Sequence, residues 1–344
     1  MLAPERRTRA DLYAAVAIAV VVAVVAAVVW MKSAARGTES RPAAQPASAA
    51  SSADRLPDAL TERWHAPDDA ALRALTSTGV AITGDGGTVR GLDPGDGHQI
   101  WTYQRDIPLC GLESQFGTVI ATYRDDRGCS QTTMLGAGDG SRRTARSSYM
   151  DSQVRLSTDG TYVLAQGPKR LEMWRSDLVR TLEYGYVDAP VNPHAQPRND
   201  CDLMSASAGG GRLAVLERCP EESANRLTVL NPAPKDAAAP EEYGSHVLTE
   251  PGGGAANARV IAVSDNRIVL YLPGTDSTPP EFAVYDASAN LLTTHRLTAP
   301  IADDGSVVRL GSSYFVFTGN SVIALNATSF EPQWTAPGAL GTPA

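Results

Sequence analysis

Hydrophobic residues follow two different patterns along this chain. Residues 12–31 form one continuous apolar run that contains no charged side chain. From residue 58 onward, short apolar runs rich in β-branched residues alternate with turns rich in Gly, Pro and Asp. No helical period extends over a long stretch of this second part. The pattern therefore predicts a single membrane-length helix followed by an all-β body.

The apolar runs of the body come in six pairs. They lie at residues 80–82 with 88–92, 118–123 with 132–135, 162–165 with 170–174, 212–216 with 226–230, 267–272 with 281–285, and 314–317 with 321–325. A further candidate strand precedes each pair and a fourth follows most of them, at intervals of about 38 to 55 residues. Four short strands repeated six times predict a six-bladed β-propeller, in which each small sheet packs between two neighbours.

One strand–turn–strand stretch, residues 88–103, carries the clearest repeat motif. Its turn at 93–97 combines the fixed φ of proline with glycines that adopt positive φ cheaply, as a tight reversal requires. The motif residues are Leu92, Asp93, Gly97 and Trp101, with Leu325 and Trp334 repeating the nine-residue interval near the C-terminus. This stretch resembles the A-L-D-x-x-T-G-x-x-x-W repeat of pyrroloquinoline-quinone-type propellers, from which Gly91 and Asp96 depart. The resemblance implies a quinoprotein-like propeller over about residues 60–340.

The sequence leaves the closure of the ring open. Trp64 stands eight residues before Leu72, as Trp101 stands before Leu109, so the segment around Trp64 has the pattern of an outer strand. Residues 333–335 have the same pattern at the other end of the body. Either one of the two segments is extra in a six-bladed ring, or a seventh, partial blade exists.

The apolar run 12–31 is long enough to cross a membrane. At about 1.5 Å per residue, a helix of this length spans about 30 Å, the thickness of the hydrocarbon layer. Tyr13 and Trp30 stand at its two ends, where amphipathic aromatics favour the interface. The alternatives are a cleaved signal peptide, for which 33–35 offers a small-residue site, and a buried helix. The length favours an uncleaved anchor, since signal peptides have shorter apolar regions.

The flanking charges predict the orientation of this anchor and the division of the chain. Arg6, Arg7 and Arg9 precede the run, against Lys32 and Arg36 after it, which favours a cytoplasmic N-terminus. We therefore expect a cytoplasmic tail at 1–11, a transmembrane helix at 12–31 and an extracytoplasmic propeller at 58–344. Residues 32–57, rich in Ala, Ser and Pro, are predicted to be a flexible stalk.

Charge and composition narrow the class of protein. The net charge of −8 and the isoelectric point near 5.2 argue against a body that binds nucleic acid. Lysine occurs only at positions 32, 169 and 235, and this preference for arginine is typical of a high-GC bacterial genome. The expected location is therefore the plasma membrane of a bacterium, with the body outside the cytoplasm.

Four cysteines allow three disulfide pairings. Cys201 and Cys219 are symmetric about Gly210 in a glycine-rich turn, so an antiparallel hairpin would place them opposite each other. Cys110 and Cys129 hold the corresponding places in the second unit. We predict the pairs Cys110–Cys129 and Cys201–Cys219, which an exported domain can form. The alternative is a zinc site formed by all four cysteines. It is disfavoured because the sequence lacks the C-x₂-C spacing typical of such sites.

Both predicted disulfides fall on one rim of the propeller, together with the longest loops. These loops are predicted at 124–131, 186–200, 217–225, 250–256 and 273–280. Long loops on a rigid scaffold commonly carry binding residues, although they can also be tolerated insertions. The candidate interaction residues on this rim are Arg124, Asp125, Asp126, Arg127, Glu221 and Glu222.

The sequence contains no recognisable catalytic, metal-binding or cofactor-binding motif. The five histidines are scattered, and neither a G-x-S-x-G nor a phosphate-binding glycine motif is present. Quinone-dependent dehydrogenases, which the repeat resembles, typically have eight blades, a calcium site and a disulfide between adjacent cysteines. This chain has six units and no adjacent cysteines, so we expect a protein that is not an enzyme and binds no cofactor.

These observations predict a membrane-anchored scaffold that presents its loops to another envelope protein. Outer-membrane assembly propellers, which the repeat also resembles, use this architecture for protein contacts. One alternative is a sensor that binds a small ligand in the central channel. Arg155, Asp202 and Arg309 would line that channel, where they could bind an anion or, as we favour, form solvated charge pairs. A second, less favoured alternative is an enzyme similar to the quinone-dependent dehydrogenases.

Overall fold

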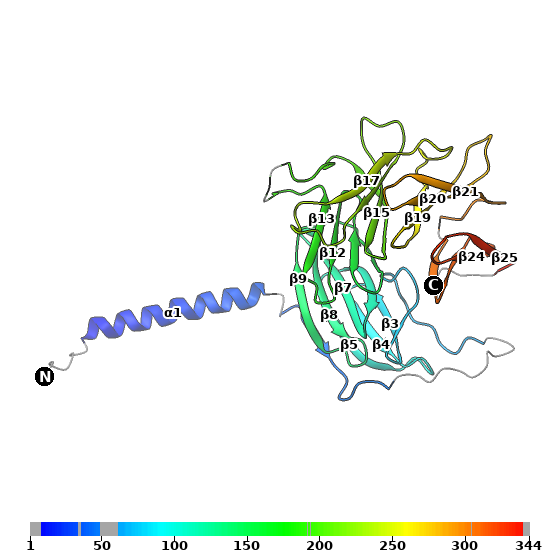
Figure 1. Cartoon of the computed structure of the whole chain (residues 1–344). Helices are drawn as coiled ribbons and strands as arrows, with labels where there is room; N and C mark the ends of the chain where they lie inside the picture. The colour runs from blue at the N-terminus through cyan, green and yellow to red at the C-terminus, as the bar shows by residue number, and fades with distance from the viewer. Residues whose placement is uncertain are drawn as a thin grey trace.

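The computed structural model describes residues 8–33, 36–48, 61–190, 192, 194–303 and 305–339. In these residues it contains one helix, α1 (Arg9–Lys32), and 25 strands arranged as six antiparallel sheets (Figure 1). Each sheet is a four-stranded meander in which consecutive strands pair, and the first sheet has one additional strand. The chain is an all-β propeller with six blades, as the repeated pattern predicted.

The strand bounds define the blades in chain order. Blade one contains β2 (Leu75–Ser77), β3 (Val80–Asp85), β4 (Thr88–Leu92) and β5 (Gln99–Arg105), with β1 (Thr38–Arg41) beside β5. Blade two contains β6 (Leu109–Gln115), β7 (Thr118–Asp125), β8 (Gly128–Gly136) and β9 (Arg142–Ser147). Blade three contains β10 (Arg155–Thr158), β11 (Val163–Gln166), β12 (Arg170–Trp174) and β13 (Arg180–Gly185).

The second half of the body repeats this arrangement. Blade four contains β14 (Asp202–Gly209), β15 (Arg212–Arg218), β16 (Arg226–Leu230) and β17 (Glu242–Val247). Blade five contains β18 (Arg259–Val263), β19 (Arg267–Leu272), β20 (Glu281–Asp286) and β21 (Leu291–Arg296). Blade six contains β22 (Val307–Leu310), β23 (Ser313–Phe317), β24 (Ser321–Asn326) and β25 (Pro332–Pro337).

Five hydrophobic cores hold neighbouring blades together, one at each seam from blades one and two to blades five and six. The middle strands of a blade, such as β7 and β19, are apolar on both faces, because each face is covered by a different neighbour. Burying one large aliphatic side chain in such a seam contributes about 1.5–3 kcal/mol. The seams therefore provide most of the stability of the ring.

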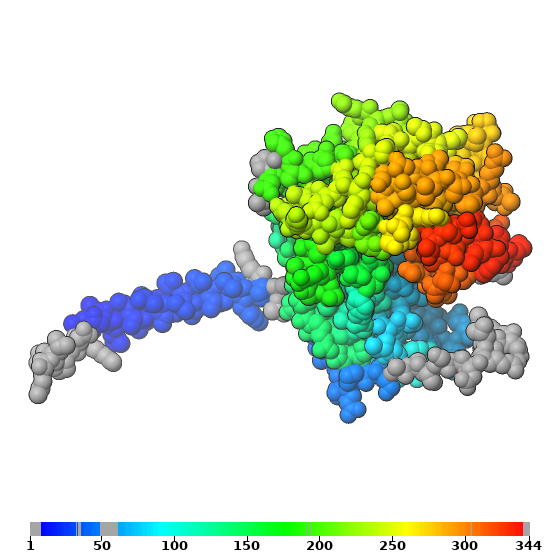
Figure 2. Space-filling view, viewed as in Figure 1, coloured from blue at the N-terminus to red at the C-terminus, as the bar shows by residue number. Residues whose placement is uncertain are grey.

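No hydrophobic core among the described residues joins blade six to blade one. Val307, Tyr314 and Val316 face blade five, so by strand alternation Val308 and Phe315 face the other way. On this second face, which we call the open face of blade six, Val308, Leu310 and Trp334 are 41 %, 64 % and 50 % exposed. Figure 2 shows blade six (red) packed against the orange residues of blade five.

The predicted anchor helix is confirmed as a helix and lies apart from the body (Figure 1). Thr8 caps its first turn, accepting a hydrogen bond from the backbone of Asp11 while the Asp11 carboxylate accepts one from the Thr8 backbone. None of its apolar stretch is buried against the rest of the chain. Most of the predicted cytoplasmic tail, residues 1–7, lies outside the described residues.

The predicted flexible stalk is wrong for residues 37–47. The outer edge of β5 offers unpaired N–H and C=O groups, and β1 pairs with it from Thr38 opposite Arg105 to Arg41 opposite Thr102. Asp106 donates its backbone N–H to Gly37, and Ala43 and Ala47 donate to blade two. Only five peptide units separate Lys32 from Gly37, so the tether reaches at most about 17 Å. The propeller is thus held close to the end of α1.

Because β1 pairs with β5, we expect that a disulfide can be engineered between the two strands. In a variant with Arg41→Cys and Thr102→Cys, the two new cysteines stand directly opposite each other and should form a disulfide on mild oxidation. The matched control pairs Arg41→Cys with Gln99→Cys, about 10 Å further along β5. Mass spectrometry of the digested protein should find the cross-linked peptide only in the first variant. Equal cross-linking in both would show that residues 38–41 are mobile.

Candidate functional site

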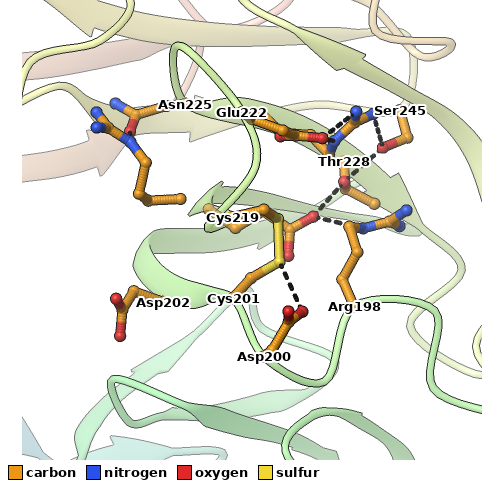
Figure 3. The surroundings of a disulfide bond; sticks show 12 residues. Arg198, Asp200, Cys201, Asp202, Cys219, Glu222, Asn225, Thr228 and Ser245 are labelled. Atoms are coloured by element: carbon orange, nitrogen blue, oxygen red, sulfur yellow. Dashed lines mark hydrogen bonds and ion pairs between the residues drawn. A yellow bond between two sulfur atoms is a disulfide. The ribbon is translucent and has the colours of Figure 1, made fainter.

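The predicted disulfides are both present and lie on one rim. Cys201 directly precedes β14 and Cys219 directly follows β15, and Asp202 pairs with Arg218 beside them (Figure 3). The hairpin turns at Gly210 and Gly211, whose φ angles of 55° and 72° suit glycine. A bulge at Met204 shifts the register by one residue, which places the two cysteines opposite each other. The rim disulfide therefore depends on that bulge.

A buried carboxylate lies next to this disulfide. Glu217 accepts hydrogen bonds from Tyr184, from the Nε of Arg198 at 2.9 Å and from the hydroxyl of Thr228 at 2.6 Å. Burial raises the pKa of Glu217 above its ordinary value, although these donors oppose the shift. Arg198 also pairs with Glu242, so it fastens the 186–200 loop to blade four. The sequence pattern did not single out Glu217 as a site residue. Its side chain lies on the same face of β15 as those of Leu213 and Val215, which pack between blades three and four.

The predicted loop at 124–131 is wrong. β7 continues to Asp125 and β8 begins at Gly128, so only two residues form the reversal. Asp125 organises this turn by accepting hydrogen bonds from the Arg127 backbone at 2.8 Å, from Ser130 at 2.6 Å and from Gln131 at 2.8 Å. The tight turn leaves no inserted loop on blade two. The Cys110–Cys129 disulfide instead links β6 to the start of β8.

The candidate rim residues form two separate groups. Asp125 and Arg127 pair with each other at the β7–β8 turn of blade two. Glu222 pairs with Arg226 beside the Cys201–Cys219 disulfide in blade four (Figure 3). Blade three lies between these two blades. Arg124, Asp126 and Glu221 are exposed in the same two groups, and their role as an interaction surface stays a prediction.

The inner strands surround a central channel with a cavity of about 510 Å³. Arg155 and Arg309 line it as predicted, but Asp202 does not, because it pairs with Lys169 at 2.8 Å on the rim. Arg73 pairs with Glu113 at 2.6 Å inside the channel. Binding of a small anion in this cavity stays a prediction.

Two groups of side chains in the described residues come close enough together to be considered for a metal. One comprises Cys201, Glu217 and Cys219, but its two sulfurs are already joined in the disulfide and offer no thiolate. The other comprises Asp93, Asp96 and His98 in the exposed repeat turn. There the hydrogen bonds of Asp93 to Gly95 and of Asp96 to His98 serve the turn itself.

The repeat motif residues form turns and pack at the seams between neighbouring blades. Asp93 accepts from the backbone of Gly95 at 2.7 Å, and Gly97 has the positive φ of 77° that the turn requires. Leu92 and Leu325 are buried, and Leu325 packs between blades five and six. Trp101 is buried and donates its indole N–H to Ala137 of blade two at 2.8 Å. Trp334, its counterpart in blade six, lies on the open face.

Comparisons with known proteins support the fold. No protein-family model and no curated protein sequence matches this chain. Among solved structures, Sqt1 of Saccharomyces cerevisiae has a TM-score of 0.50 and 12 % identity, covering 76 % of this chain and 71 % of that one. The WD40 domain of Pan2 from Neurospora crassa has a TM-score of 0.43 at 12 % identity, with 78 % of each chain covered. The fold is a propeller. At such identities the likeness concerns the fold alone.

The same substitution should destabilise the protein at Trp101 and have almost no effect at Trp334. Trp101→Phe removes the donor to the buried carbonyl of Ala137, so the free energy of unfolding should fall by about 1–3 kcal/mol. Trp334→Phe serves as the matched control and should change the free energy of unfolding by no more than about 0.5 kcal/mol, because its side chain is half exposed. Urea denaturation of both variants measures the difference. Equal losses would contradict the open face of blade six.

Asp125 should contribute to the free energy of unfolding in a way that depends on pH. Partial burial favours its neutral form, but the hydrogen bonds from Ser130, Arg127 and Gln131 outweigh this and hold the pKa of Asp125 below its ordinary value of 3.8. The stabilisation is therefore present above pH 3.8 and is lost as the pH falls through the lower folded-state pKa. Asp125→Asn should reduce the free energy of unfolding at neutral pH by about 1–3 kcal/mol, with a smaller difference in acid.

Denaturation at a series of pH values measures the effect of Asp125→Asn. Asp126→Asn is the matched control, since the neighbouring side chain is exposed and should leave stability unchanged at every pH. A difference between wild type and Asp125→Asn that does not vary with pH would show that the charge of Asp125 is not what stabilises the turn.

Proposed function

We propose that this protein is a membrane-anchored, extracytoplasmic β-propeller that acts without catalysis as a protein-interaction scaffold in the bacterial cell envelope. The observation that carries the proposal is the open face of blade six. Val308, Leu310 and Trp334 expose apolar surface there, on a sheet whose other face packs against blade five. Contiguous exposed apolar surface on an otherwise well-packed domain is typical of protein-interaction sites.

Two features support the membrane anchor and the extracytoplasmic location. Helix α1 is long and apolar enough to cross a membrane and packs against nothing in the chain. Trp30 lies exposed at its C-terminal end, with the Arg36 guanidinium over its ring. The two disulfides fit an oxidising compartment, which supports a body outside the cytoplasm and an N-terminus inside.

The position of the open face favours a protein over lipid as its occupant. The short tether fixes the outer edge of blade one close to the end of α1. Blade six lies on the side of the ring away from α1 (Figure 1). With α1 in the membrane, the open face would be turned toward the aqueous phase of the envelope. The rim groups on blades two and four would add polar contacts to the same assembly.

A pull-down from native membranes tests the scaffold function. The full chain, extracted in mild detergent, should retain an envelope protein, and Leu310→Glu should reduce that retention by about tenfold or more, because a charge buried in an interface is costly. Leu292→Glu is the matched control, since Leu292 is also half exposed but lies on β21 in blade five. Retention that is equal in both variants, or loss of the protein from membranes washed at alkaline pH, would contradict the proposal.

A further inference from the structure

Trp101, on the outer strand of blade one, packs into a turn of blade two. We call this position in the turn the seat of an outer-strand tryptophan. The indole N–H of Trp101 donates to the carbonyl of Ala137, and its ring lies over Gly140, where a Cβ would meet the ring at 2.6 Å. Gly140 has a φ of 68° and donates its own N–H to Gly136. The seat is thus a tight turn with a carbonyl acceptor three residues before a glycine. A tryptophan on one blade fills the turn of the next.

Trp64 fills the same seat on blade one. Its indole N–H donates to the carbonyl of Pro94 at 3.0 Å, and its ring lies over Gly97, where a Cβ would meet the ring at 2.8 Å. Pro94 stands three residues before Gly97, as Ala137 stands before Gly140. Gly97 likewise has a positive φ and donates to Asp93, four residues back. Trp64 therefore lies where the outer strand of a preceding blade would place its tryptophan.

Trp334 is consequently left without a seat. A ring that closed directly from blade six to blade one would place Trp334 on the turn of blade one, but Trp64 occupies that turn. Trp334 instead contacts Phe315 of its own blade, with the ring centroids 5.7 Å apart. One more blade would provide a turn to receive Trp334, and its outer strand would stand where Trp64 lies.

The segment around Trp64 has the character of an isolated outer strand. In the described part of the chain, the backbone of residues 61–68 makes no backbone–backbone hydrogen bond. Its N–H and C=O groups are thus open to pairing with a strand, as at any free sheet edge. The first backbone pairing comes at Asp69, which donates to Gly84 of blade one. Residues 61–66 are therefore fixed at one end and by the seat of Trp64.

We propose that the space between blade six and blade one accepts a three-stranded β-meander from a partner protein, which completes a seventh blade with residues 61–66 as its outer strand. The partner's sheet would be apolar toward the open face of blade six, and its turn would offer a carbonyl and a glycine to Trp334. Its third strand would pair with residues 61–66 through the backbone. The proposal rests on the proposed scaffold function and names the partner's chemistry.

The described sheets have no strands to spare for a seventh blade, which favours a partner as their source. Three strands of about five residues with two turns need about twenty residues. The longest stretch outside the described residues is 49–60, which is shorter than this. All six sheets of the body already have four strands, so none has strands to spare.

Hydrogen exchange of the purified full chain provides the first test. Because residues 61–66 have no backbone hydrogen bond to the other described residues, we expect their amides to exchange as fast as those of an unstructured peptide, apart from local shielding at Trp64. The amides of β3 and β4, paired on both sides, serve as the protected reference. Slow exchange at 61–66 in the purified chain would show that the chain fills the space itself, and would overturn the proposal.

Photo-crosslinking in native membranes provides the second test. A photoreactive residue is introduced at Leu310 on the open face, at Arg63 beside Trp64, and at Leu292 as an exposed control. Leu310 and Arg63 should capture the same protein, with the captured peptides mapping to one antiparallel β-meander of that protein. Trp334→Ala should reduce both adducts by about tenfold or more, as expected for a central tryptophan of an interface, and leave thermal unfolding unchanged.

The outcomes separate this inference from the scaffold function. Adducts within one chain between blades six and one, adducts to a second copy, adducts to lipid alone, or equal adducts at Leu292 would each overturn the seventh-blade proposal. Capture of a protein at Leu310 without capture at Arg63 would leave the scaffold function standing and refute the inference alone. The absence of adducts at every position would refute both.

Discussion

The structure depends on one requirement: each small sheet must cover both of its apolar faces with a neighbouring sheet. A four-stranded sheet alone exposes too much apolar surface to be stable in water, so the blades stabilise one another around the ring. Five seams meet this requirement with continuous hydrophobic cores. Among the described residues, the sixth seam has no such core, and the exposure of Leu310 and Trp334 follows from that.

Polar side chains fix the seams by hydrogen bonds that apolar packing cannot direct. Between blades two and three, the buried carboxylate of Glu172 accepts from Arg146 and Arg170 at 2.8 Å and from the indole of Trp174 at 2.8 Å. Arg146 also lies over the ring of Trp174. Such a network is costly to leave half satisfied, so it favours one relative arrangement of the blades. On the rim, Glu217 and Arg198 do the same for a loop.

The tether and the open face lie at different sides of the ring. Because β1 is part of blade one, the propeller is held near the end of α1 by a very short connection. Blade six, with its open face, lies on the far side of the ring (Figure 1). The body is thus connected to α1 at one edge and exposes apolar surface at another.

The sequence alone determined the apolar helix, the six four-stranded units and both disulfides, because these follow from local hydrophobic period, turn residues and cysteine spacing. It could not locate β1 and β9, whose T-E-S-R and R-R-T-A-R-S segments are polar, because only the free edges of β5 and β8 make them strands. Nor could it separate the roles of Trp64 and Trp334, which share one local pattern. Tertiary structure decided between them, because a single turn on blade one can seat only one indole ring, and Trp64 holds it.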